Sequence, residues 1–411
     1  MRLLVLVSYD SFLNVGKLIG SRFEQAGCAV DVALVKTGRK NQISSAQINI
    51  LGQGQDIPWI SIPEFLRNPE FLEYNCIFCC LEGLSIRRLI HSLTRLTDRR
   101  PLIVCAYPGL LLRDAYDGLA MRSGCDLVWL NSTKDIDAYR KMCDAFGISA
   151  GNARLFGVAP LLQKIERSDD DKTKPVVFFE QAVIPRHYDE RVYLARQLVI
   201  LAKKFPDRQF IIKLRATGDD VTLHQPSYPL DPLLIEAAKS QGGWPQNLRL
   251  SSKESAVSLL AKASHCLTIS STVSVQAIKA GIPTAIIGDY GAREEYGLNY
   301  FFGSGLITTF DKIRFPFEGK PEKYWWSYNV EDPDRHIARL ISETIELAAS
   351  DLPELSPQSL AAEFSPELRR HFLEVLKLDD FLARKYERPK NDVGITRKLM
   401  SRLLRRKRNR Q

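Results

Sequence analysis

Residues 269–291 read ISSTVSVQAIKAGIPTAIIGDYG, and this stretch decides the fold expected for the chain. An apolar run ends at Ile269, three hydroxyl side chains follow, and residues 273–280 carry the apolar spacing of a helix. Gly281 and Pro283 end that helix before a second apolar run begins. Strand, helix and strand in this order predict a parallel βαβ unit.

The same alternation extends outward to both ends of the chain. It predicts an α/β fold class with two Rossmann-like, doubly wound domains that face a cleft. The strands expected in the first half are Leu3–Val7, Ala29–Val35, Cys76–Leu81, Leu102–Cys105, Leu127–Leu130 and Arg154–Phe156. Those in the second half are Val176–Phe179, Phe210–Leu214, Leu248–Leu250, Cys266–Ile269 and Thr284–Ile287. The clearest helices are Val15–Gln25, Ile86–Leu96, Asp135–Ala145, Glu190–Lys204 and Ser255–Lys262.

Polar residues 166–175 are typical of a linker, and they divide the chain into a first domain at 1–165 and a second at 175–365. A long helical pattern at 366–388 predicts a closing helix that crosses back towards the first domain. Residues 389–411 form a basic tail. Of 57 Lys and Arg and 48 Asp and Glu, nine basic residues and one acidic residue lie in this tail, which leaves 48 and 47 in residues 1–388. The body is therefore close to neutral, and we expect it to bind no specific nucleic acid.

The eight cysteines lie mostly in apolar runs, where a thiol packs as a small hydrophobic group. Cys76, Cys79 and Cys80 lack a second pair at zinc spacing, and Cys76 and Cys79 should point to opposite faces of a strand. The run Asp169–Asp171 fits a solvated linker better than a metal site. We expect no metal site, and thiols of this kind suit a reducing cytoplasm.

Three strand ends of the second domain carry polar side chains that could hold an anion. Ser270, Ser271 and Thr272 follow one strand, at the start of a helix whose free N–H groups attract phosphate. Hydroxyls here are equally typical of simple helix caps. Lys213 and Arg215 stand at the end of a second strand, and Glu180 and Gln181 at the end of a third. Because ligands bind outside the carboxyl ends of parallel strands, these residues predict a nucleotide-phosphate site.

The strand–SSTV–helix–GIP–strand arrangement resembles the donor half of GT-B glycosyltransferases, and is most similar to the bacterial capsule and surface-polysaccharide group with its Kdo, sialyl and polysialyl transferases. The chain also resembles an uncharacterised set of bacterial glycosyltransferase-like proteins in Asp10-Ser11, in YPGLLLRDAYDGLAMRSGCDLVWLNS (107–132) and in FFEQAVIPRHYDER (178–191). This similarity covers about residues 1–300. Where capsule enzymes often carry Lys-x-His-Pro, this chain has Lys213-Leu-Arg215-Ala216, so Arg215 or His224 would replace the histidine.

The resemblance implies a first domain on the acceptor side and a second that holds a nucleotide-sugar, with a CMP-sugar favoured. Ser270, Ser271 and Thr272 would then hold the donor phosphate, Lys213 and Arg215 would offset its charge, and Glu180 and Gln181 would line the site. No metal or other cofactor is expected, because the helix start, hydroxyls and cations can stabilise the leaving phosphate.

A transferase of this kind needs a base for the acceptor hydroxyl, and the base should come from the first domain. Asp10 is the first candidate and Glu82 the second, followed by Asp114 and Asp117. For Asp10, a plain turn or helix-cap carboxylate is an equal alternative. His187 and His265 fit surface or packing roles better, and there is no GxSxG motif for a Ser-His-Asp site.

The expected function is thus metal-independent sugar transfer to a surface glycan or lipid-linked acceptor. Two alternatives stay open: a CDP-polyol phosphotransferase of the teichoic-acid type, and a non-catalytic nucleotide-sugar binding protein. The tail, at 394–408, has an apolar and a basic helical face, which favours an anionic membrane surface over nucleic-acid contact or plain disorder. The expected localisation is cytoplasmic, with peripheral attachment to the inner face of the plasma membrane.

Overall fold

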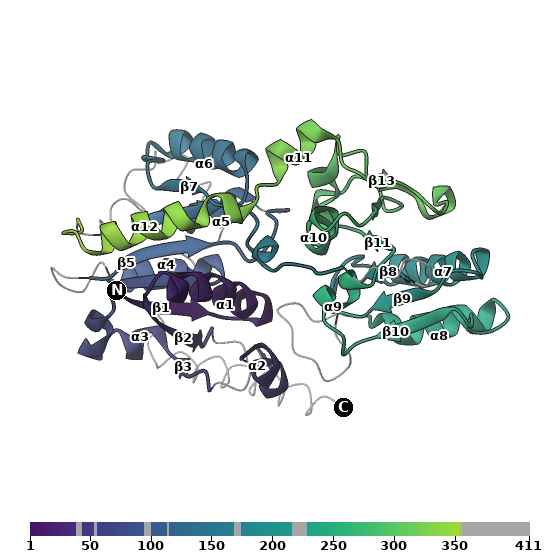
Figure 1. Cartoon of the computed structure of the whole chain (residues 1–411), viewed down its shortest axis with the longest axis horizontal. Coiled ribbons are helices and arrows are strands. Elements are labelled where there is room, and N and C mark those ends of the chain that lie inside the picture. The colour runs from purple at the N-terminus through teal and green to yellow at the C-terminus, as the bar shows by residue number, and fades with distance from the viewer. Residues whose placement is uncertain are drawn as a thin grey trace, which may run out of the picture.

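The fold is given by a computed structural model, which describes residues 1–37, 43–52, 56–93, 100–112, 115–167, 174–215, 228–353 and 355. Figure 1 shows two α/β lobes side by side, with the first lobe in purple and blue and the second in teal and green. The prediction of two Rossmann-like domains is confirmed. The expected closing helix at 366–388, the tail and the run Asp169–Asp171 lie outside the described residues.

Within the described residues, the first lobe has a seven-stranded parallel sheet in the order β3-β2-β1-β4-β5-β6-β7. Its strands are β1 (Arg2–Val7), β2 (Ala29–Val35), β3 (Trp59–Ile60), β4 (Cys76–Cys80), β5 (Leu102–Ala106), β6 (Leu127–Leu130) and β7 (Ala153–Leu155). Its helices are α1 (Asp10–Gln25), α2 (Ser45–Gly52), α3 (Ile62–Phe65), α4 (Gly83–Leu93), α5 (Ala115–Ala120) and α6 (Thr133–Phe146), with the 3₁₀ helix η1 (Pro69–Glu73).

Both faces of this sheet are covered, which is why its central strands are continuous apolar runs. One face packs with α1 around Val5, Phe23 and Trp129, and the other packs with α4 and α6. Cys76 belongs to the first core cluster and Cys79 to the second, so the two thiols point to opposite faces, as the strand alternation predicts. All eight cysteines are free and buried.

In the second lobe, the described residues form a six-stranded parallel sheet in the order β10-β9-β8-β11-β12-β13. Its strands are β8 (Val176–Phe179), β9 (Phe210–Lys213), β10 (Leu248–Ser251), β11 (His265–Thr268), β12 (Thr284–Ile287) and β13 (Ile307–Thr308). The α-helices are α7 (Tyr188–Lys204), α8 (Leu230–Ser240), α9 (Ala256–Ala261), α10 (Val273–Lys279) and α11 (Lys323–Asn329). The 3₁₀ helices are η3 (Glu294–Tyr296), η4 (Leu298–Phe301) and η5 (Phe310–Lys312).

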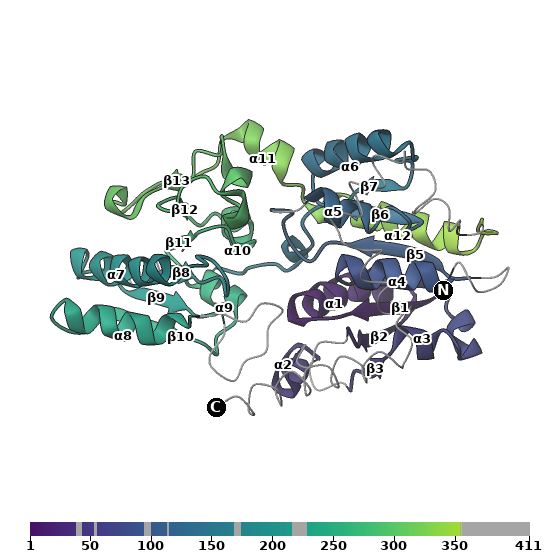
Figure 2. The ribbon, with the colours of Figure 1, turned by 180° about the vertical axis from the view of Figure 1, so that it is seen from behind.

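The last described helix, α12 (Ile337–Ala348), corrects the predicted domain boundary. Residues 337–348 were assigned to the second domain, yet α12 lies across the first lobe in both views (Figures 1 and 2). Its Ile337, Leu340 and Ile341 are buried in the same core cluster as Val5 and Phe23. The apolar face of α12 thus supplies part of the first lobe's core, and the chain crosses back before residue 337.

Two short 3₁₀ helices mark the crossings between the lobes. η2 (Ala159–Leu162) leads out of the first lobe, and η6 (Pro333–Arg335) leads back to it. They pass each other closely: a Cβ atom on Gly157 would lie 2.5 Å from the backbone nitrogen of Pro333. Gly157 also has a φ of +120°, so only glycine fits this crossing point without strain. No helix among the described residues is long and apolar enough to cross a membrane.

Candidate functional site

Most of the predicted site residues lie where the strand order of each sheet reverses, and Lys213 and Arg215 lie at the end of the adjacent strand β9. In the first lobe, Asp10 follows β1 and Glu82 follows β4, and these two strands are neighbours. In the second lobe, Glu180 and Gln181 follow β8 while residues 270–272 follow its neighbour β11. Such switch points leave a crevice between the loops of an open α/β sheet, which is the usual position of a ligand.

The loops at and next to the two switch points are in direct contact. Asp10 Oδ2 forms an ion pair of 2.7 Å with the Arg215 guanidinium, across 205 positions of sequence. The second contact joins Thr272, whose Oγ1 accepts a hydrogen bond of 3.2 Å from the backbone nitrogen of Leu110. The carboxyl ends of both sheets therefore face the same junction between the lobes.

The hydroxyls of Ser270, Ser271 and Thr272, which stand between β11 and α10, have different surroundings. Ser270 is fully buried, donates to the carbonyl oxygen of Tyr296 and pairs with the Gln181 amide, so it holds the loop together. Thr272 is bonded to Leu110 of the first lobe. Ser271 is half-buried and precedes the N-cap of α10, and its Oγ accepts a bond of 3.3 Å from the Val273 nitrogen. Of the three, Ser271 has the hydroxyl best placed to meet a ligand.

Glu180 lies inside the second lobe, where it organises the strand ends. One of its oxygens pairs with Arg191 of α7, and the other accepts 2.9 Å from the backbone nitrogen of Arg215. Burial raises the pKa of Glu180, and the charge of Arg191 opposes that rise. Gln181 accepts 2.9 Å from the Ser270 nitrogen. These two residues therefore connect the ends of β8, β9 and β11, and act as positioning residues for the loops.

Lys213 and Arg215 differ in how freely they face the junction. Lys213 is half-buried and donates 2.6 Å to the carbonyl oxygen of Ser252, beyond β10. Arg215 has a 41% exposed side chain, held to the first lobe by Asp10. Its backbone is fixed by Glu180, so the guanidinium is the part that can exchange partners. His224 lies outside the described residues.

Two carboxylates of the first lobe keep an oxygen that has no hydrogen-bond partner. Asp10 is the first residue of α1 and is 8% exposed; its Oδ1 is buried and unpaired. Glu82 precedes α4, accepts 2.6 Å from Ser85 Oγ, and has a buried, unpaired Oε2. A buried acceptor without a partner is costly, so each of these oxygens is poised to accept a proton or a donor.

Of the other side chains considered from the sequence, three lie in a helix turn, in the core or on the surface, and one is outside the described residues. Asp114 is outside the described residues, and Asp117 lies in the first turn of α5. His265 is buried against Phe315 and Phe317, which fits the packing role expected for it. His187 is exposed at the start of α7.

Sequence reasoning missed Asp135, the carboxyl group with the most unusual environment near this edge. Asp135 lies in the first turn of α6, where its backbone nitrogen donates 3.2 Å to Ser132 Oγ. Burial raises its pKa to about 7 against the opposing hydrogen bond of Ser132. The signal was present in the sequence, since Ser132-x-x-Asp135 is a capping-box spacing directly after a buried strand.

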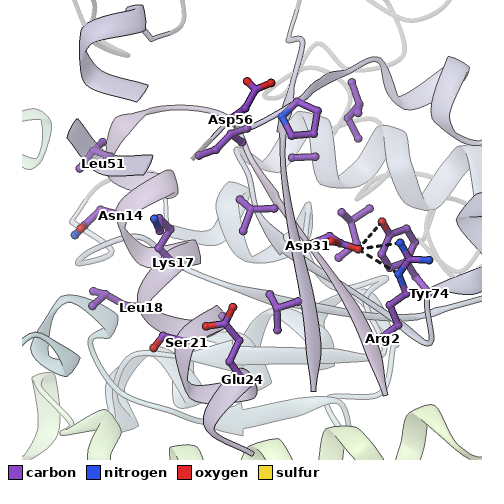
Figure 3. A pocket seen from close by; sticks show the side chains of 18 of the residues that line it. Arg2, Asn14, Lys17, Leu18, Ser21, Glu24, Asp31, Leu51, Asp56 and Tyr74 are labelled. Atoms are coloured by element: carbon purple, nitrogen blue, oxygen red, sulfur yellow. Dashed lines mark hydrogen bonds and ion pairs between the residues drawn. The ribbon is translucent and has the colours of Figure 1, made fainter. Parts of the chain in front are cut away.

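A hollow of about 800 Å³ lies elsewhere on the first lobe (Figure 3). It follows the open side of β2, because β3 pairs only with Leu34 and Val35 and leaves the first half of β2 uncovered. Asn14, Lys17 and Ser21 of α1 line one side, with Asp31 and Tyr74 on the other. The predicted site residues do not line it, so the candidate site stays at the junction. In the described part of the chain, no three His, Cys, Asp or Glu side chains are grouped to hold a metal ion.

Solved structures with a similar fold are UDP-GlcNAc 2-epimerases. The Methanocaldococcus jannaschii enzyme has a TM-score of 0.55 and 12% identity, over 84% of this chain and all of that one. The Neisseria meningitidis enzyme bound to UDP-GlcNAc has a TM-score of 0.53 and 13% identity, over 84% of this chain and 100% of that one. At this identity the likeness shows the fold alone. A comparison with curated proteins gave no match.

The family assignment comes from the sequence itself. The model of the family described as "Putative glycosyltransferase (DUF6716)" matches residues 3–342, which include both sheets and every predicted site residue. The two facing Rossmann-like lobes are the architecture of GT-B enzymes. The chain therefore belongs to this glycosyltransferase family and is an enzyme of the GT-B type.

Proposed function

We propose that the protein transfers a sugar from a nucleotide-sugar donor to a hydroxyl of a surface glycan or lipid-linked acceptor, without a metal ion. One observation carries the proposal: Asp10, at the switch point of the first sheet, lies 2.7 Å from Arg215, which follows β9 next to the switch point of the second sheet. A carboxylate that can take a proton thus stands beside a cation that can meet a phosphate. Sugar transfer from a nucleotide requires both groups at one place.

In the proposed reaction, the unpaired Oδ1 of Asp10 accepts the proton of the acceptor hydroxyl. The acceptor oxygen forms a bond to the anomeric carbon while the bond from that carbon to the phosphate oxygen breaks. The nucleotide leaves with the electron pair, and Arg215, Lys213 and the Ser271 hydroxyl offset its negative charge. We favour Asp10 over Glu82 as the base because Asp10 faces the cation of the other lobe.

The nucleotide is proposed to be a pyrimidine nucleotide, with a CMP-sugar favoured by the resemblance of the SSTV element to capsule enzymes. The fold likeness to enzymes crystallised with UDP-GlcNAc supports a nucleotide-sugar of some kind. A panel of CMP, CDP, UDP and GDP in a thermal-shift assay tests this, because a ligand that binds the native state raises the melting temperature. We expect the largest shift from CMP or CDP.

The site is tested with Arg215→Met and with Arg140→Met as the matched control, since Arg140 is an exposed arginine of α6. Arg215→Met should weaken nucleotide binding at least tenfold, because the loss of a charge-assisted contact to phosphate removes about 1.5–3 kcal/mol. Equal binding by both variants would remove Arg215 from the site.

The chemistry is tested with Asp10→Asn, which should lower turnover by about 10²–10⁴-fold while nucleotide binding persists. Turnover that persists in Asp10→Asn and disappears in Glu82→Gln would transfer the role of base to Glu82.

A donor labelled in its phosphate distinguishes sugar transfer from the alternative reaction, because a CDP-polyol phosphotransferase would carry that phosphate into the product. Addition of EDTA should leave turnover unchanged if the cations alone stabilise the leaving group.

A further inference from the structure

The loop that follows β5 reaches out of the first lobe and into the second. This loop, residues 107–112, is called the plug loop below. Leu110 and Leu112 pack against the main core cluster of the second lobe, whereas Leu111 between them packs against the first lobe's own core. The fit is close at its far end, where a Cβ atom on Gly297 would lie 2.9 Å from Leu112 Cβ.

The plug loop also contacts the hydroxyl of Thr272, which stands at the start of α10. Leu110 donates its backbone N–H to Thr272 Oγ1 at 3.2 Å. A Cβ atom on Gly109 would lie 2.6 Å from the same oxygen, so Gly109 is the residue that allows this approach. Asn131 fixes the loop from behind by donating 2.8 Å to the carbonyl oxygen of Gly109. The backbone of the plug loop therefore covers the start of α10.

Arg215 is bonded to the same lobe by a second contact, its ion pair with Asp10. Arg215, which the proposed function assigns to the donor phosphate, and Thr272, which the resemblance assigns to it, thus already have partners in the first lobe. The Asp10 carboxylate would have to give way before Arg215 could turn its charge to a phosphate. Thr272 Oγ1 accepts from Leu110 and keeps its own O–H to donate, but the backbone at Gly109 lies close against that oxygen and covers it. Asp10 is similarly engaged, on the oxygen opposite the unpaired Oδ1.

We propose that the plug loop is an autoinhibitory contact that a nucleotide phosphate displaces, and this inference rests on the proposed function. Arg215 exchanges the single charge of Asp10 for the phosphate, and Leu110 and Leu112 withdraw from the second lobe. Withdrawal uncovers the Thr272 hydroxyl, whose O–H then donates to a phosphate oxygen. The exchange frees the Asp10 carboxylate for the acceptor hydroxyl. Donor therefore binds before acceptor, and the closed form lowers the apparent affinity for the donor by the fraction of molecules that are open.

A disulfide can hold the plug loop in place. A Cβ atom on Gly109 would lie 3.5 Å from Thr272 Cβ, within the range that a disulfide spans. All eight native cysteines are free and buried, so the new pair is the reactive one.

Oxidised Gly109→Cys/Thr272→Cys should bind CMP and UDP at least tenfold more weakly than its reduced form in calorimetry. The reduced form should bind at least as tightly as the single variant Thr272→Cys, because a side chain at position 109 crowds the approach to residue 272. Equal affinity of the oxidised and reduced forms would overturn the proposal.

A second pair of variants tests the opposite effect without changing a proposed phosphate ligand. Leu112→Ala loosens the plug loop and should strengthen CMP or UDP binding several-fold. In this variant a larger fraction of molecules is already open, so less free energy is needed to open the site. Leu111→Ala is the matched control, because this neighbour faces the first lobe, and its affinity should stay at the wild-type value.

The results separate the two proposals. Nucleotide binding by the wild-type protein that neither the disulfide nor Leu112→Ala alters would refute the plug loop and leave the donor site standing. Binding seen in Leu112→Ala but absent in the wild-type protein would support the plug loop strongly. Absence of nucleotide binding in every variant would refute both proposals, because removal of the plug loop must uncover the site.

Discussion

At the scale of single residues, His265 should make the stability of the protein depend on pH. Its ring is buried against Phe315 and Phe317, and burial, reinforced by the charge of Arg208, lowers its pKa from 6.5 to about 4. Between these two values the unfolded chain binds a proton that the folded chain does not. The free energy of unfolding should therefore fall as pH drops from 6.5 towards 4, by up to about 1.4 kcal/mol per unit.

Urea denaturation of wild-type protein and His265→Leu at pH 7.5 and pH 5.0 measures this effect. The difference in unfolding free energy between the two pH values should be smaller in His265→Leu than in the wild-type protein. His187→Gln, which alters an exposed histidine, should keep the wild-type difference. An unchanged pH dependence in His265→Leu would show that the buried imidazole is not its source.

At the scale of elements, the pair Glu180–Arg191 joins β8, β9 and α7. Glu180→Gln leaves the Arg191 guanidinium charged, only 2% exposed and without its carboxylate. Loss of one partner of a buried ion pair costs about 3–5 kcal/mol, so the urea midpoint should fall markedly. The double variant Glu180→Gln/Arg191→Met should recover part of that loss. Additive losses in the double variant would mean that the two side chains do not act as a pair.

The sequence predicted the strands well because they are buried on both faces. Leu127–Leu130, Val176–Phe179 and Thr284–Ile287 have the predicted bounds, since a strand covered on both faces is a continuous apolar run. Ala29–Val35 also has the predicted bounds, although only residues 33–35 of this strand are buried. The two-residue strands β3 and β13 are too short to give such a signal.

The contacts that the site residues make could not be predicted from the local sequence pattern. The strand-end rule placed Asp10, Arg215 and residues 270–272 at the correct edges. It could not show that Asp10 pairs with Arg215, because that contact links residues 205 positions apart. Glu180 was expected to line the site, whereas the fold turns it inward to Arg191, because the rule gives the edge of the sheet and not the direction of a side chain.

At the scale of the whole molecule, α12 should be needed for the stability of the first lobe although it follows the second in sequence. Leu340 is fully buried among first-lobe side chains, and Arg154 of β7 pairs with Glu343 of α12 at 2.7 Å. Leu340→Ala should lower the free energy of unfolding by about 2–5 kcal/mol through the cavity it leaves. Hydrogen exchange should then accelerate in β1 and α1. Acceleration confined to the second lobe would contradict this placement.

Because α12 packs on the first lobe, it also affects how the protein folds during translation. Val5 and Phe23 are made first, yet the helix that covers their side of the sheet is made only after residue 336 has been added. The second lobe, whose strands run from residue 176 to residue 308, is already complete by then. During translation the part of this face that α12 covers must therefore stay exposed beside α1, and we expect a nascent-chain chaperone to bind there.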